Sequence, residues 1–159
     1  MNSKDWIESL LQLKYAEEDF SDCFTVEIVH SPKGNKIEVY IDADNGLAFD
    51  RCQKISRYLE AIFDEDLRFT ESYLLEVSSP GISRPLKFIR QYRKNIDRIL
   101  TVDTLSGKQS EGILTKVEDD HIVLQYETKR KEGKKNIKEI VDETIPFDQI
   151  KQAIVNISF

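Results

Sequence analysis

The sequence predicts an α+β protein built from two domains, residues 1–83 and residues 84–159. Three observations predict this organisation: the hydrophobic periodicity changes along the chain, a stretch bounded by prolines separates the two patterns, and the sign of the net charge reverses across it. The first pattern indicates a two-layer α-β-β-α-β domain and the second a small β-barrel. With 159 residues, 40% of them hydrophobic, the chain is long enough to bury a core in each domain.

Hydrophobic spacing defines five elements in the first domain. They are a helix at 3–18, strands at 24–30 and 37–41, a helix at 48–64 and a strand at 72–78. Apolar residues recur every three or four positions in the helices and every second position in the strands. The inner face of the second helix is expected to hold Phe49, Cys52, Ile55, Leu59, Ile62 and Phe63. Ser31–Asn35 supplies the turn residues of a hairpin between the first two strands.

The second domain is predicted to consist mostly of short strands. After a short basic helix at 86–95, strands are expected at 98–103, 109–118, 121–127, 139–145 and 151–157. Turn signals such as Ser106-Gly107 separate them. Five short strands within roughly 60 residues favour a closed or half-closed barrel of the SH3-like or Sm-like kind. The basic interval Lys129–Lys138, which contains Gly133, is expected to be an exposed loop on that barrel.

The net charge of −6 hides an uneven distribution. Residues 1–83 carry 17 acidic and 8 basic side chains, a net −9, whereas residues 84–159 carry 12 acidic and 15 basic side chains, a net +3. Because charges are screened beyond about 8 Å at physiological salt, an acidic domain does not cancel a basic patch on its neighbour. Two basic clusters therefore supply candidate RNA contacts: Arg84, Lys87, Arg90, Arg93 and Lys94, and then Lys129, Arg130, Lys131, Lys134 and Lys135. Alternatively, either cluster is only a solvated face.

The first domain is expected to bind protein. Its α-β-β-α-β order is similar to that of a KH-type RNA module, but the sequence lacks the Gly-x-x-Gly loop with which a KH domain clamps nucleotides. Because the domain is also acidic, Asp42, Asp44 and Asp50 are candidate contacts with a basic protein partner. The run Asp42–Gly46 starts like a calcium loop, but its glycine is at the fifth position where such a loop needs the sixth, so a turn is the better interpretation.

Nothing in the sequence indicates an enzyme or a cofactor. It has no Gly-x-Gly-x-x-Gly or Walker motif, and neither His30 nor His121 has a nucleophile in a recognisable arrangement. Cys23 and Cys52 are expected to be buried reduced thiols, and no metal site is predicted. No apolar run approaches the roughly 20 residues that cross a bilayer, and the N-terminus starts no secretory signal. We therefore expect a cytoplasmic monomer without cofactor, membrane contact or small-molecule substrate.

The segment between the two domains contains two prolines and a glycine. Its candidate hinge residues are Ser78, Ser79, Pro80, Gly81, Arg84 and Pro85. Each proline fixes its own backbone and biases the residue before it away from helix. The simplest interpretation is a rigid link between the domains. Its serine and arginine donors could in addition hold a phosphate or a carboxylate.

This segment also carries a family resemblance. The run LEVSSPG followed by Arg84-Pro85-Leu86, at the end of Tyr40–Leu86, resembles the signature of the ribosome maturation factor RimP family. The resemblance implies an α/β N-terminal domain, an SH3-like C-terminal barrel and a non-catalytic factor that binds the maturing 30S ribosomal subunit. It also implies contact with the strongly basic small-subunit ribosomal protein twelve. The family usually has Asp before the arginine of the motif, where this chain has Ser83, which implies a looser hinge.

Two other classes of function remain open at this point. An enzyme that processes precursor rRNA would need a cofactor pocket or a catalytic cluster, and the sequence shows neither. A module that binds only protein would carry the lysine cluster merely as a solvated surface. Nuclease treatment separates this second class from an RNA binder, because binding to protein alone survives the loss of RNA.

Overall fold

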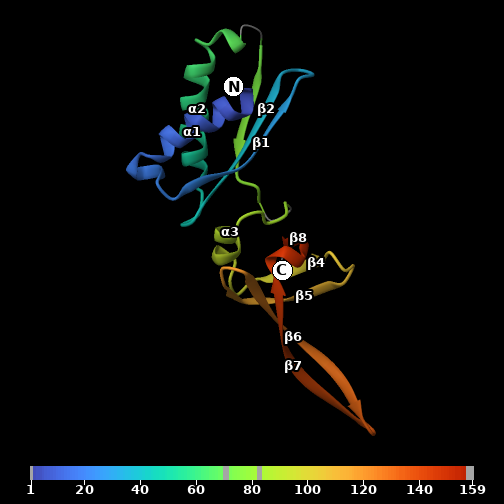
Figure 1. The fold of residues 1–159 in the computed structure, drawn as a ribbon. Helices are drawn as coiled ribbons and strands as arrows, with labels where there is room; N and C mark the ends of the chain where they lie inside the picture. The colour runs from blue at the N-terminus through green and yellow to red at the C-terminus, as the bar shows by residue number, and fades with distance from the viewer. Residues whose placement is uncertain (1, 70–71, 82–83, 157–159) are drawn as a thin grey trace. The chain divides into compact units, whose positions relative to one another are not determined.

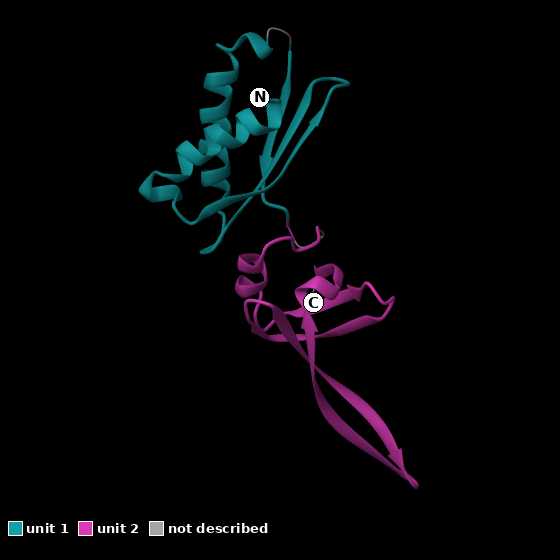
Figure 2. Cartoon of the chain, viewed as in Figure 1, with its two compact units in different colours: residues 1–80 teal, residues 81–159 magenta. Residues whose placement is uncertain are grey.

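The computed structural model describes residues 2–69, 72–81 and 84–156. The chain divides into two compact units, residues 1–80 and residues 81–159 (Figure 2), and each unit has its own hydrophobic core. The predicted domain boundary after Ser83, and Ser83 itself, lie outside the described residues, as does the predicted end of the last strand at 157.

Unit 1 has the predicted α-β-β-α-β order. Its elements are α1 (Ser3–Tyr15), β1 (Cys23–Ser31), β2 (Lys36–Ala43), α2 (Phe49–Phe63) and β3 (Leu74–Ser78), with short 3-10 turns at Glu18–Phe20 and Leu67–Phe69. The sheet order is β1-β2-β3, in which β1 and β2 are antiparallel and β2 and β3 are parallel. The parallel pair is possible because α2 carries the chain back along the sheet. Both helices lie on one face of the sheet (Figure 1).

Alternation along β2 produces the two-layer arrangement of unit 1. Ile37, Val39 and Ile41 are completely buried, whereas Glu38 and Tyr40 between them are only half-buried. Successive side chains of a strand point to opposite faces, so the three isoleucine and valine side chains share the face that the helices cover. The largest fully buried partners from the helices are Ile7, Leu11, Ile55, Leu59 and Phe63. Cys23 and Cys52 are buried, as predicted.

The prediction that Phe49 faces the core is wrong. Phe49 is 82% exposed, while Cys52 and Ile55 of the same helix are buried. Phe49 is the first residue of α2 and precedes the first buried turn. The apolar periodicity of α2 therefore begins before the part of the helix that packs against the rest of unit 1. Periodicity alone does not show where this packing starts.

Unit 2 contains one short helix and a five-stranded antiparallel sheet. Its elements are α3 (Ile89–Lys94), β4 (Ile99–Thr104), β5 (Gln109–Val117), β6 (His121–Glu132), β7 (Lys135–Pro146), a 3-10 turn (Phe147–Gln149) and β8 (Ile150–Val155). The strand order is β7-β6-β5-β4-β8, so the last strand of the unit pairs with the first. Within the described part of the chain, β7 and β8 are the two edges of this sheet and do not pair, so no closed barrel is observed.

The prediction of a loop at Lys129–Lys138 is wrong, although these residues are largely exposed, as expected. β6 and β7 pair continuously from His121 and Pro146 to Glu132 and Lys135. Only Gly133 and Lys134 remain for the turn, and Gly133 has a φ of 64°. A glycine with positive φ at the first of two turn positions is the type II′ arrangement that continues a hairpin. A high density of lysines therefore did not interrupt the strands.

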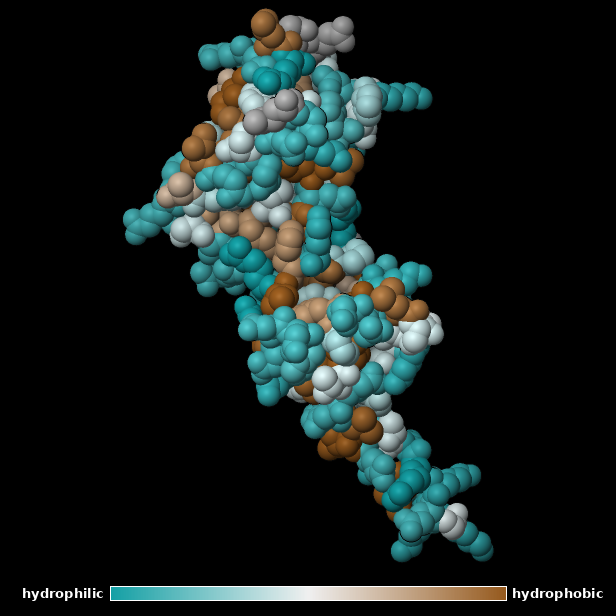
Figure 3. Space-filling model, in the orientation of Figure 1, coloured by the Kyte–Doolittle hydropathy of each residue, from teal (hydrophilic) through white to brown (hydrophobic). Residues whose placement is uncertain are grey.

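The outer part of this hairpin is a two-stranded arm, which we define as residues 126–141. Pairing of β5 with β6 reaches only to Ile113 opposite Gln125, so the arm has no third strand. Figure 1 shows the arm projecting from the rest of unit 2. Its tip is hydrophilic in the face of the molecule that Figure 3 displays. A bare ribbon of this kind buries little apolar surface and is stabilised mainly where it joins the sheet.

Candidate nucleic-acid interface

The register of the arm separates its charged residues onto two faces. Directly opposite residues of an antiparallel pair share a face, and neighbours along a strand do not. Lys129 lies opposite Lys138, and Lys131 lies two positions further along the same face. We call these three residues the lysine face. The other face of the tip, the mixed face, holds Arg130, Glu132, Lys135 and Glu139.

The charges of the mixed face are balanced. Arg130 Nη2 lies 3.1 Å from Glu139 Oε1 and 3.7 Å from Glu132 Oε2. Two basic and two acidic side chains stand together there, so this face has no net formal charge. Exposed ion pairs of this kind contribute little to folding, about 0.2–1 kcal/mol each. They do, however, occupy the guanidinium group of Arg130 with protein carboxylates.

The lysine face is electrostatically unbalanced. Lys129 and Lys138 are directly opposite each other, and a like-charged cross-strand pair is destabilising. Among the ion pairs of the described residues, none involves Lys129, Lys131 or Lys138. Their ammonium groups therefore gather three positive charges on one side of the tip. Glu127, on the same face but nearer the root, leaves this face of the arm with a net charge of +2, against zero on the mixed face. Such a surface attracts an anion.

Glu143 holds the root of the arm. Its carboxylate accepts hydrogen bonds from Lys108 Nζ at 2.9 Å, Ser110 Oγ at 2.9 Å and Tyr126 OH at 3.0 Å. Partial burial alone would raise the pKa of Glu143, but the hydrogen bonds from these three donors outweigh it and lower the pKa. Because the four residues come from β5, β6, β7 and the turn before β5, one carboxylate joins the strands that carry the arm.

Gly112 allows β5 to approach β6 closely at the same root. A Cβ atom at this position would lie 2.8 Å from the backbone oxygen of Gln125 and 3.3 Å from the ring of Tyr126. The first distance is too short for any side chain, and the oxygen belongs to the backbone. The root therefore requires glycine for space, independently of backbone conformation.

The second basic cluster is arranged around α3. Buried Gln91 accepts hydrogen bonds from the backbone N–H groups of Lys87 and Phe88 and so fixes the start of the helix. Tyr92 packs edge-on against Phe147, and burial raises its pKa to about 12. The candidate cations lie outside this packing: Lys87, Arg93 and Lys94 are exposed, and Arg84 and Arg90 are half-exposed. Arg93 Nη2 lies 3.1 Å from Asp119.

The two basic clusters of unit 2 do not merge into one surface. In Figure 1, α3 lies at one end of unit 2 and the tip of the arm at the other. Lys134 occupies the turn at that tip, and Lys135 begins β7 on the mixed face. The ten predicted RNA contacts are therefore divided among the α3 region, the lysine face, the mixed face and the turn. Only the strand register separates the last three groups from one another.

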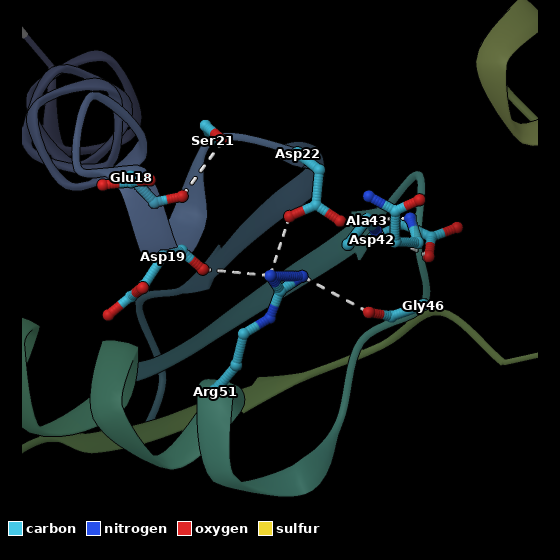
Figure 4. A network of polar contacts seen from close by, with 9 residues as sticks. Glu18, Asp19, Ser21, Asp22, Asp42, Ala43, Gly46 and Arg51 are labelled. Carbon is cyan, nitrogen blue, oxygen red and sulfur yellow. Dashed lines mark hydrogen bonds and ion pairs between the residues drawn. The ribbon is translucent and has the colours of Figure 1, made fainter.

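In unit 1, an arginine organises the acidic end of the sheet (Figure 4). Arg51 of α2 donates to Asp22 Oδ1 at 2.7 Å and to the backbone oxygens of Asp19 and Gly46 at 3.0 and 3.3 Å. Gly46 has a φ of 89°, and its N–H closes the turn on Ala43. Together these contacts join the start of β1, the β2–α2 connection and the start of α2. We call this set, Asp19, Asp22, Gly46 and Arg51, the arginine corner.

The three predicted acidic contacts differ in accessibility. Asp42 is only 8% exposed, and its carboxylate accepts a hydrogen bond from the Ala43 N–H. Asp42 stabilises the end of β2 and, because it is buried, is not part of the accessible acidic surface. Asp44 and Asp50 are exposed beside the arginine corner. Between them in the sequence lies exposed Phe49, which sequence analysis assigned to the core.

The candidate hinge is described only in part. Ser78 ends β3, Pro80 is buried and Gly81 has a φ of 66°, a backbone conformation that favours glycine. Beyond the undescribed residues 82–83, the Leu86 N–H donates to the Ala153 oxygen of β8. The backbone after the motif is thereby tied to the sheet of unit 2.

Metal-ligand clusters and membrane-spanning helices are both absent from the described residues. Across 2–69, 72–81 and 84–156, no three His, Cys, Asp or Glu side chains are grouped as a metal ion would require. In those same ranges, no helix combines the length and the apolar character needed to span a bilayer.

Comparison with known proteins gives a consistent result. Residues 14–83 match the family model described as the RimP N-terminal domain. Proteins named ribosome maturation factor RimP are similar to the chain. That of Flavobacterium psychrophilum is 33% identical over 100% of both chains, and that of Cytophaga hutchinsonii is 33% identical over 98% of this chain and 95% of its own. That of Porphyromonas gingivalis is 38% identical over 84% of this chain and 86% of its own. Because the similarity extends from unit 1 through unit 2, the chain belongs to the ribosome maturation factor RimP family.

Proposed function

We propose that this protein is a maturation factor of the small ribosomal subunit that acts by binding and not by catalysis. The observation that carries this proposal is the 33–38% identity with proteins named ribosome maturation factor RimP over most of the chain. In this proposal the protein is a cytoplasmic monomer. Transient occupancy of the immature 30S subunit favours one order of folding, without any bond chemistry.

The two units supply surfaces of opposite sign for this role. Unit 1 carries a net charge of −9 and presents Asp44 and Asp50 beside the arginine corner. Unit 2 carries a net +3, concentrated around α3 and on the arm. Basic surfaces suit rRNA phosphates, and an acidic surface suits a basic ribosomal protein such as small-subunit protein twelve.

Co-sedimentation with purified 30S particles over a range of salt concentrations tests the proposal. Each lysine or arginine that neutralises a phosphate contributes about 0.7–0.9 to the slope of log affinity against log salt. We expect binding at 50 mM salt that falls steeply by 300 mM. Absence of co-sedimentation with both mature and immature 30S particles at 50 mM salt contradicts the proposal.

A module that binds only protein is the second candidate. The exposed Phe49 beside acidic residues favours it, since aromatic residues are typical anchors of protein interfaces. Binding to the basic ribosomal protein should then persist after nuclease digestion, and binding to deproteinised rRNA should be absent. For an RNA-processing enzyme, purified protein should convert labelled precursor rRNA, and we expect no conversion.

The finer features of the fold are part of the same proposal. We propose that unit 2 is an SH3-like barrel in an open form, which is supported by the pairing of its last strand with its first and by the 3-10 turn before β8. We also propose that residues 1–83 and 84–159 are separate domains and that Ser78–Pro85 is their hinge. Limited proteolysis at this segment, giving two stable fragments, is the expected result.

A further inference from the structure

We infer that the arm binds the phosphate backbone of RNA through its lysine face, Lys129, Lys131 and Lys138, and that the mixed face takes no part. This inference rests on the proposed function and sharpens it. It names one side of one hairpin as the contact and phosphate groups as the ligand. The predicted contacts Arg130 and Lys135 are assigned to the other side, and Lys134 to the turn.

Spacing on the lysine face fits a row of phosphates. Lys129 and Lys131 are two residues apart on one strand, which places their Cα atoms about 6.5 Å apart. Lys129 and Lys138 face each other across the ladder, with Cα atoms about 4.5–5.5 Å apart. Their flexible stems let the three ammonium groups adjust around neighbouring phosphate oxygens. Binding would also remove the repulsion between Lys129 and Lys138, so the ligand stabilises the arm.

The proposed role on an immature ribosomal subunit favours phosphate over a protein carboxylate as the ligand. Lysine binds phosphate as a compact point charge, and three lysines on one face suit a continuous polyanion, whereas the arginine fork suits carboxylate and phosphate alike. The arginine of the arm, Arg130, is already paired with Glu139 and Glu132 on the mixed face. An acidic protein is therefore the weaker candidate ligand and becomes an outcome of the test.

The composition of the arm indicates contact with the backbone and not with the bases. The aromatic residue of the arm, Tyr126, is half-buried at its root and hydrogen-bonded to Glu143, and residues 127–140 contain none. Bases stack on aromatic rings or on arginine, and Arg130 is engaged by Glu132 and Glu139. Base edges are read by arginine, lysine, asparagine or glutamine in fixed geometry, and among the described residues no side chain holds the three lysines in place. Asn136, opposite Lys131, is the only amide in this segment. We therefore expect binding that depends strongly on salt and weakly on RNA sequence.

Protection of an exposed sheet edge is the competing explanation for the lysines, because charged residues on edge strands prevent association with other sheets. Such protection depends on the total charge of the arm and not on which face carries it. Two variants with the same change of charge separate these explanations. Lys129→Gln/Lys131→Gln/Lys138→Gln removes three charges from the lysine face. Arg130→Gln/Lys134→Gln/Lys135→Gln removes three from the mixed face and the turn.

The experiment measures affinity of the full-length chain for deproteinised small-subunit rRNA between 50 and 300 mM salt. The lysine-face variant should lose about 2 units of salt slope, since each contact contributes at least about 0.7, and about a hundredfold in affinity at 100 mM salt. The control variant should lose less than 0.5 units of slope. Replacement of the same three lysines by arginine should retain the slope. Circular dichroism checks that both variants keep the native strand content.

Other outcomes overturn the inference in distinct ways. Equal losses in the two variants show that only the total charge matters, and no loss in either shows that the arm does not touch RNA. Binding to polyglutamate that is lost in the lysine-face variant, with rRNA binding unchanged, assigns the face to an acidic protein. In each of these cases, retained co-sedimentation of the wild-type chain with 30S particles leaves the proposed function standing. If the wild-type chain does not co-sediment with 30S particles, both the inference and the proposed function are contradicted.

Discussion

The arginine corner and the arm use cations in opposite ways. Arg51 is 19% exposed and is enclosed by a carboxylate and two backbone oxygens. Lys129, Lys131 and Lys138 extend from a two-stranded ribbon and repel one another. An enclosed cation replaces its hydration with fixed protein acceptors and stabilises the fold, whereas an exposed and repelled cation is available to a ligand. The role of a basic residue therefore follows from its acceptors and not from its position in a basic or acidic segment.

Among changes at the arginine corner and the arm, removal of Arg51 should have the largest effect on stability. Arg51→Ala removes the guanidinium donor from Asp22 Oδ1 and from two backbone oxygens, while Asp22 Oδ2 keeps its bond from the Asn45 N–H. We expect a loss of about 2–3 kcal/mol in the free energy of unfolding. Urea unfolding monitored by circular dichroism measures it. Lys54→Ala in the same helix is the matched control, because Lys54 is exposed, and should change stability by less than about 0.5 kcal/mol. Similar values for the two variants would show that the enclosed contacts of Arg51 do not stabilise unit 1.

The root of the arm should be nearly as sensitive. Gly112→Ala places a methyl group against the Gln125 backbone oxygen, and overpacking of this kind costs about 1–3 kcal/mol. Gly107→Ala is a control in which any destabilisation has a different cause. A Cβ at Gly107 meets no atom within 4 Å, so only the positive φ of 89° is strained. Gly112→Ala should in addition weaken rRNA binding, since the arm loses its support. A stable variant with native binding would show that the strands can separate without moving the arm.

Acid should weaken the root through Glu143. Because the pKa of this carboxyl is lowered in the folded state, its stabilising effect is complete above its ordinary value of 4.5 and is lost as the pH falls through the lower folded value. Glu143→Gln should therefore cost about 1 kcal/mol at pH 7 and progressively less below pH 4.5. Urea unfolding of both proteins between pH 3 and pH 7 measures the difference. A difference that stays constant with pH would contradict this account.

Phe49 should have the smallest effect on stability. Because it is 82% exposed, Phe49→Ser should change the free energy of unfolding by less than about 0.5 kcal/mol. Leu59→Ala, a fully buried change in the same helix, should cost about 2–5 kcal/mol. Thermal and urea unfolding of the two variants compare them directly. A large loss for Phe49→Ser would restore the original prediction that this side chain belongs to the core.

Much of the fold could be predicted from the sequence, and the failures have identifiable causes. Alternation along β2 and helical spacing in α2 identified most of the core of unit 1, since a buried face must be apolar at a fixed period. The prediction that Phe49 faces the core was wrong because Phe49 continues the apolar period beyond the part of α2 that packs against the sheet. The prediction for Lys129–Lys138 was wrong because charge density by itself does not distinguish a loop from an exposed strand. The two halves of this segment pair with each other, from Lys129 and Lys138 to Glu132 and Lys135, around a two-residue turn at Gly133.

The candidate site was predictable in composition and not in arrangement. The sequence alone established which cations the chain carries, that the two halves of the chain differ in charge and, through the Leu75–Leu86 signature, the family. Tertiary structure decided that Asp42 is buried, that Arg51 is enclosed, and that adjacent Lys129 and Arg130 point to opposite faces with different partners. The reason is that composition and local periodicity are properties of neighbouring residues along the chain, whereas burial, pairing and facing depend on residues that only folding brings close.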